Sequence, residues 1–269
     1  MPADIEGVRH LTEIVERLLG PNGCPWDRTQ TLSTLRTYLL EEAYELLDAM
    51  EASFEHHREE VGDMLFQLVF QSAIREQQGD FTLGEAAQEV AQKLIRRHPH
   101  VFAGDTSQAM PAVTDGRLGQ GERNWESFKK QEKKRESLMD DIPSTLPALM
   151  QAEKVQRRAA SVGFDWPDIQ GAKEKILEEL AEWEQAIARH DPQAMEEELG
   201  DLLFAVVNAA RHASVAPELA LLRATKKFKE RFRMMETFAS QANVSLQELS
   251  LDELELLWQK AKKLAHDHP

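Results

Sequence analysis

The sequence predicts an all-α protein that is built from two similar helical modules in tandem. Three observations support this fold class. Apolar residues recur mostly with the period of a helix, alternating strand-like runs are nearly absent, and one set of motifs occurs twice in the same order. The chain has 269 residues, which is enough for two domains that each bury a core.

Composition and charge narrow the functional classes. The net charge of −15 disfavours general affinity for nucleic acid or anionic membranes. No apolar run approaches the roughly 20 residues of a membrane-spanning helix, and the acidic N-terminal segment does not resemble an export signal. Cys24 is the only cysteine, which excludes an intrachain disulfide and a thiolate metal cage. We therefore expect a cytoplasmic protein that binds neither nucleic acid nor membranes.

Two interruptions of the helical pattern divide the chain. Residues 104–121 are rich in Gly, Ser, Thr and Pro and predict a mobile loop, and a charged helix is expected over 122–136. The second break contains Pro143 and Pro147 and separates two similar halves. The sequence thus predicts an N-terminal module over residues 1–139 and a C-terminal module over residues 140–269.

The two halves share their motifs in register. GCPWD near the start of the first half is answered by GFDW in the second, EEAYE by EELAE, and EVGDMLFQ by ELGDLLFA. Lys-x-x-x-Arg and Trp-x-x-x-Lys follow in each half. Glu42 and Glu179 lie 137 residues apart, and Asp63 and Asp201 lie 138 apart. Such constant spacing indicates an internal duplication.

The acidic motifs place carboxylates in pairs. Residues three apart share one face of a helix, and Asp191 followed by Pro192 predicts a helix start between the two acidic motifs of the second half. An antiparallel hairpin would then bring the pairs together. The predicted metal ligands of the C-terminal module are Glu179, Glu182, Glu198 and Asp201. Their counterparts in the N-terminal module are Glu42, Glu45, Glu60 and Asp63.

Clustered carboxylates call for a cation. Two like charges about 4 Å apart repel by roughly 4 kcal/mol near a protein surface, and oxygen-only ligands favour a hard ion such as Mg²⁺. One alternative is that these acids only solvate exposed helix faces, but the repeated spacing argues against it. Another is a ferritin-like di-iron site, which uses Glu-x-x-His, a pattern that none of the nine histidines forms.

E-E-x-x-E followed by E-x-x-D resembles the signature of the all-α nucleoside triphosphate pyrophosphohydrolases, and the tandem arrangement resembles the MazG family. The resemblance covers nearly the whole chain. It implies hydrolysis of a nucleoside triphosphate to the monophosphate and pyrophosphate, with Mg²⁺ as cofactor, and it implies a homodimer. Phosphoribosyl-ATP hydrolysis is a narrower alternative, but that relative resembles a single module.

In that setting, residues of the second half acquire expected roles. Lys227 and Arg231, one turn apart, can hold phosphates, and Trp258 can stack on a base with Lys262 one turn away. A solvated basic helix and a core tryptophan are the plainer alternatives. A cluster carboxylate is expected to accept the proton of the attacking water, and the candidates for this catalytic base are Glu178 and Glu179.

One difference between the halves predicts that the C-terminal module carries most of the activity. Seven residues after the motif Asp, the second half has Asn208 where the first has Phe70. Positions i and i+7 share a helix face, so Asn208 is expected to face the substrate and bind it, whereas Phe70 offers no hydrogen bond. A different class of function also stays open, namely a catalytically silent nucleotide- or protein-binding module.

Overall fold

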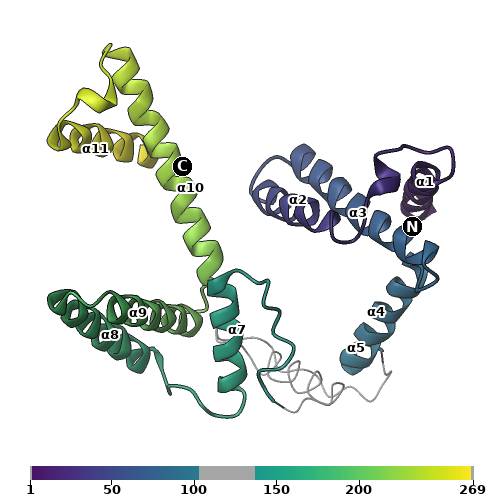
Figure 1. Ribbon diagram of the computed structural model, residues 1–269, viewed down its shortest axis with the longest axis horizontal. Coiled ribbons are helices and arrows are strands. Elements are labelled where there is room, and N and C mark those ends of the chain that lie inside the picture. Colours follow the sequence, from purple (N-terminus) through teal and green to yellow (C-terminus); the bar gives the residue numbers. More distant parts are fainter. Residues whose placement is uncertain (1, 103–136, 268–269) are drawn as a thin grey trace. The chain divides into compact units, whose positions relative to one another are not determined.

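The computed structural model describes residues 2–102 and 137–267 (Figure 1). Within these ranges the regular elements are helices, and no strand occurs, which confirms the all-α prediction. The predicted loop over 104–121 and the predicted helix over 122–136 lie outside the described residues, as do the motif residues Trp125 and Lys129. None of the described helices is both long and apolar enough to span a membrane.

The chain divides into two compact units, Met1–Ala109 and Met110–Pro269. Each unit contains one copy of the repeated acidic motifs, as the duplication predicts. The division falls outside the described residues, so the module boundary at residues 139–140 stays a prediction.

The N-terminal unit contains a helical hairpin of α2 (Leu35–Ala49) and α3 (Phe54–Gln77), and α1 (Pro2–Leu19) packs on α3. The hairpin turn ends at Ser53, whose side chain accepts a hydrogen bond from the backbone of His56 and so caps α3. The core of the unit contains Val15, Leu35, Val69, Phe70, Ala73 and Ile74. The remaining elements of the unit are η1 (Asp27–Thr29), α4 (Leu83–Arg97) and α5 (Pro99–Phe102).

GCPWD connects α1 to the hairpin through a tight turn. A Cβ atom on Gly23 would lie 2.0 Å from the carbonyl oxygen of Leu18, so only glycine fits at this position. The next amide, of Cys24, donates to the same carbonyl at 2.9 Å. The motif therefore has a structural role in closing the end of α1.

The C-terminal unit contains the matching hairpin of α8 (Ile169–Arg189) and α9 (Pro192–His212). Asp191 caps α9 by accepting from the amides of Gln193 and Ala194, both at 3.2 Å, and Pro192 is the first helical residue. The predicted helix start is confirmed. The other elements of the unit are α7 (Ala148–Ala160), α10 (Pro217–Gln241), η2 (Leu246–Glu248) and α11 (Leu251–Asp267).

GFDW fixes the segment before α8 to the end of α9. Arg211, only 8% exposed, donates to both carboxylate oxygens of Asp165, and Nε2 of His212 lies 3.1 Å from the same carboxylate. Partial burial opposes ionisation of Asp165, but the hydrogen bond and charge of Arg211 outweigh it and lower the pKa of the carboxyl below its ordinary value of 3.8. Asp165 of this motif thus pairs with the buried Arg211 and holds the segment before α8 against the end of α9.

Replacing Asp165 by Asn is expected to destabilise the C-terminal unit by about 2–3 kcal/mol, because Arg211 keeps a buried charge without its partner. The lowered pKa means that the Asp165 carboxylate stabilises the fold above pH 3.8, and that this stabilisation is lost as the pH falls toward the lowered value. Thermal melting at neutral pH and in acid measures both effects. An unchanged melting temperature at neutral pH would contradict this role.

Candidate metal centre

Three of the four predicted carboxylates of the C-terminal unit come together between α8 and α9. Ligand oxygens of Glu179, Glu182 and Glu198 lie within 4.8 Å of one another. Glu179 and Glu182 are three residues apart on α8, and Glu198 approaches from α9. The oxygens of Asp201 do not lie within this distance of all three, so its place in the metal site stays a prediction.

The chemistry of this cluster fits a hard divalent cation. Glu179 is only 4% exposed, and its Oε2 has no hydrogen-bond partner within the described part of the chain. Burial and then the charges of Glu179 and Glu198 raise the pKa of Glu182. A bound cation would satisfy the buried oxygen and relieve the repulsion, and oxygen-only ligands suit Mg²⁺.

Sequence reasoning missed a lysine beside this cluster. Nζ of Lys175 lies 2.6 Å from Oε1 of Glu179 and 2.8 Å from Oε1 of Glu178. The hydrogen bonds that Lys175 donates to Glu178 and Glu179 raise the pKa of Lys175, so its ammonium stays charged. Its position one turn before Glu179 is a spacing at which a helix pairs opposite charges, and that signal was present in the sequence.

Lys175 contacts both candidates for the catalytic base. Both candidates, Glu178 and Glu179, share the Lys175 ammonium, but Glu178 is exposed whereas Glu179 is buried in the cluster. A carboxylate at the edge of the cluster can accept a proton from water without giving up a cation ligand. The structure is compatible with either residue, and the choice stays open.

The N-terminal unit also has a cluster of three carboxylates, but different motif positions supply them. Ligand oxygens of Glu42, Glu60 and Asp63 lie within 4.8 Å of one another, and Glu45 does not join them at that distance. The pKa of Glu42 is raised by burial and then by the charges of Asp63, Glu45 and Glu60. Here the motif Asp belongs to the set, in contrast to Asp201 in the C-terminal unit.

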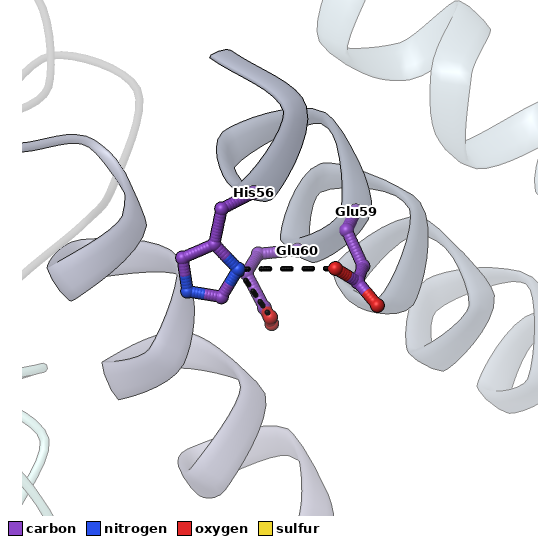
Figure 2. A group of neighbouring side chains, drawn as sticks. All are labelled: His56, Glu59 and Glu60. Carbon is purple, nitrogen blue, oxygen red and sulfur yellow. Dashed lines mark ion pairs between the residues drawn. The ribbon is translucent and has the colours of Figure 1, made fainter. Parts of the chain in front are cut away.

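A histidine extends the N-terminal cluster. Figure 2 shows the imidazole of His56 beside the carboxylates of Glu59 and Glu60, and ligand atoms of all three lie within 4.8 Å of one another. His56 was not among the predicted site residues. The signal that would have found it is His-x-x-Glu-Glu on one helix, because positions i, i+3 and i+4 share a face.

The predicted substrate-binding residues lie on three helices of the C-terminal unit. On α9, the amide oxygen of Asn208 accepts a hydrogen bond from Arg211 at 3.0 Å, which ties Asn208 to the Asp165 ion pair. On α10, the guanidinium carbon of Arg231 lies 5.8 Å from the ring centre of Trp258 on α11. Phe228 packs on the same ring, with centroids 5.0 Å apart.

This arrangement brings a cation and an aromatic ring together, as a nucleotide site needs. Nε of Arg231 is buried without a hydrogen-bond partner in the described residues, Lys227 is exposed on α10, and Lys262 is half-buried on α11. α11 packs on α10, and these helices bring Trp258 to Arg231 but do not bring the pair to the carboxylates of α8 and α9. The substrate-binding roles of these residues stay predictions.

Comparison with known proteins places the two hairpins in a sequence family. The model of a family described as the MazG nucleotide pyrophosphohydrolase domain matches residues 30–102 and 169–234, which contain both acidic motifs. The nucleoside triphosphate pyrophosphohydrolase/pyrophosphatase MazG of Thermotoga maritima is 44% identical over 255 residues, or 94% of each chain. The nucleoside triphosphate pyrophosphohydrolase of Escherichia coli K12 is 41% identical over 263 residues, covering 95% of this chain and 97% of the relative. YabN of Bacillus subtilis, an uncharacterized protein, is 42% identical over 93% of this chain and 50% of its own length.

Proposed function

The chain belongs to the MazG nucleotide pyrophosphohydrolase family, and from this premise we propose a Mg²⁺-dependent hydrolysis of nucleoside triphosphates at the carboxylates of the C-terminal unit. The enzyme class follows from 41–44% identity, over nearly the full length of the chain, to nucleoside triphosphate pyrophosphohydrolases. The products of this reaction are a nucleoside monophosphate and pyrophosphate. The observation that carries the assignment of the site is the buried, unpartnered Oε2 of Glu179 inside a cluster of three carboxylates.

The carboxylates have two proposed roles, binding of the cation and activation of the attacking water. Glu179, Glu182, Glu198 and Asp201 would hold Mg²⁺, which supplies charge neutralisation to the polyphosphate when bound. Water attacks the α-phosphorus, and the anhydride bond to the β-phosphate breaks. Glu178 or Glu179 accepts the proton that the water loses, and the bonding electrons leave with pyrophosphate.

Substrate recognition falls to the basic and aromatic residues. Lys227 and Arg231 would bind phosphate oxygens, the Arg as a fork and the Lys as a point charge. Trp258 would stack on the base, Lys262 would add a second cation, and Asn208 would bind a sugar hydroxyl or base edge. Stacking and phosphate contacts use features that all nucleotides share, so we propose broad tolerance of the base and a role in maintaining the nucleotide pool.

A homodimer is part of the proposal. Apolar side chains of the C-terminal hairpin are exposed, among them Leu177 at 66%, Leu203 at 49% and Phe204 at 43%. Such a face is typical of a surface that a second copy covers. The second copy would then cover Leu203 and Phe204. We further propose that the enzyme acts in the cytoplasm and that neither nucleic acid nor a membrane is a partner, in line with the net charge of −15.

A pyrophosphate-release assay tests the function. The full chain is incubated with a panel of nucleoside triphosphates, with Mg²⁺ and with a chelator in its place. With Mg²⁺, we expect pyrophosphate release from triphosphates of several bases. Without Mg²⁺, the rate of release should fall at least about 100-fold, because the cation stabilises the transition state by several kcal/mol. A folded protein that binds nucleotides but releases no pyrophosphate under any condition would favour the silent binding module instead.

A further inference from the structure

The two carboxylate clusters differ in one ligand type, and this difference carries an inference about metal selectivity. We propose that the N-terminal unit binds a divalent first-row transition-metal ion through His56, Glu59 and Glu60 of α3. This site goes beyond the proposed function and does not depend on it. His56 supplies an imidazole nitrogen, and among the described residues no histidine joins the C-terminal carboxylate cluster.

The ligand atoms of the trio lie close together on one face of α3. Nδ1 of His56 lies 3.5 Å from Oε1 of Glu60 and 3.9 Å from Oε2 of Glu59 (Figure 2). Ligands that bind one ion at about 2.0–2.2 Å each lie roughly 3–3.5 Å apart. Small rotations of the two outer side chains therefore suffice to bring all three atoms to a common ion.

Glu60 supplies the independent indication of a ligand. It is only 7% exposed, and its Oε2 is buried without a hydrogen-bond partner in the described chain. Oε1 of Glu60 lies 3.5 Å from Nδ1 of His56, which is longer than an ordinary hydrogen bond, so this ion pair satisfies the buried carboxylate poorly. A buried carboxylate of this kind normally has a charged or hydrogen-bonded partner, and a metal ion would provide one.

His56 is accessible to an ion from solvent. It lies in the first turn of α3, just after the Ser53 cap, and its side chain is about half exposed. An imidazole nitrogen offers a lone pair to a metal ion, and the ion then carries the positive charge that Glu59 and Glu60 attract.

The duplication provides an internal comparison. Glu198 corresponds to Glu60 and Glu197 to Glu59, but the residue four before Glu198 is Ala194, which cannot bind a metal. The C-terminal cluster is thus limited to oxygen ligands, which suit Mg²⁺, whereas imidazole favours ions such as Co²⁺, Ni²⁺ and Zn²⁺. The replacement of His56 by Ala194 at the matching position would therefore give the two units different metal preferences.

Calorimetric titration of Zn²⁺ into the full chain, in the presence of excess Mg²⁺, tests the proposal. Glu60 belongs to both N-terminal groups, but imidazole favours Zn²⁺ over Mg²⁺, so we expect Zn²⁺ to bind despite the excess of Mg²⁺ and His56→Ala to weaken this binding at least about tenfold. His57→Ala, which changes the neighbouring histidine outside the trio, is the matched control and should leave it unchanged. Zn²⁺ affinity that is equal in wild type and His56→Ala would overturn the proposal.

Three further measurements test the site. In the wild-type chain, Zn²⁺ should shift the ¹⁵N resonance of one imidazole, assigned to His56 by its absence from the His56→Ala spectrum. If His56→Ala loses helix content, Glu59→Gln replaces it, since Glu59 is exposed, and unchanged Zn²⁺ binding by that variant contradicts the site. Ala194→His should add a second Zn²⁺ site beside Glu198. The results for His56→Ala, His57→Ala and Glu59→Gln concern the N-terminal unit and do not bear on Mg²⁺-dependent pyrophosphate release by the C-terminal cluster.

Discussion

Glu179→Ala is expected to lower Mg²⁺-dependent turnover by at least about 100- to 1000-fold, since metal ions contribute several kcal/mol to catalysis of this kind. Glu179 is the most buried residue of the cluster and also contacts Lys175. Its loss therefore removes a metal ligand and leaves the Lys175 ammonium without one of its two carboxylate partners. The fold should survive. The substitution removes a buried carboxylate, one oxygen of which has no hydrogen-bond partner in the described chain, and little apolar contact.

Turnover is compared with that of Glu184→Ala, which removes an exposed carboxylate from the same helix and should leave turnover unchanged. Circular dichroism verifies the helix content of both variants. Asp201→Ala is the sharper companion, because the Asp201 carboxylate lies outside the group of three. We expect a comparable loss of turnover, and near-normal activity of folded Asp201→Ala would exclude this residue from the metal site.

The second large effect concerns the two modules. Glu179→Ala with Glu182→Ala should silence the enzyme, whereas Glu42→Ala with Glu45→Ala should leave most of its activity. The reason is the residue seven positions after the motif Asp. Phe70 is 2% exposed and belongs to the core beneath α1, so it can contribute nothing polar to a nucleotide. Asn208 is half-buried on α9 and carries an amide.

Both double variants are assayed on the same panel of triphosphates, with their melting temperatures as a control for folding. The N-terminal carboxylates would then serve metal binding and structure rather than turnover. If the N-terminal pair silences the enzyme and the C-terminal pair spares it, the assignment of the catalytic half is wrong. The hydrogen bond from Arg211 to Asn208 offers the alternative that Asn208 only supports the Asp165 ion pair.

Much of the fold was predictable because it depends on local rules. Asp191 and Pro192 specify the start of α9 by capping chemistry, and the three-residue spacing of the acids places them on one face. The duplication then supplies the same hairpin twice. These features need only the backbone geometry of a helix, which the sequence encodes directly.

The membership of each cluster was harder to predict, because it depends on side-chain rotamers and on the exact approach of two helices. Spacing alone could not tell that Asp63 joins its cluster while Asp201 stays outside the group of three. Lys175 and His56 each lie one helical turn before a motif carboxylate and outside the acidic motif itself, so the motifs alone do not predict them. The tie between Asn208, Arg211 and Asp165 joins residues 46 positions apart, which no helical period reveals.

Identification of the reaction products shows whether the chain is a pyrophosphohydrolase that uses these carboxylates. The wild-type chain is incubated with a nucleoside triphosphate and Mg²⁺, and the products are separated by ion-exchange chromatography, with Glu179→Ala run in parallel. The predicted result is nucleoside monophosphate and intact pyrophosphate in equal amounts, both absent from the variant. A dominant nucleoside diphosphate peak with orthophosphate, or equal product from the variant, would contradict a pyrophosphohydrolase that acts at these carboxylates.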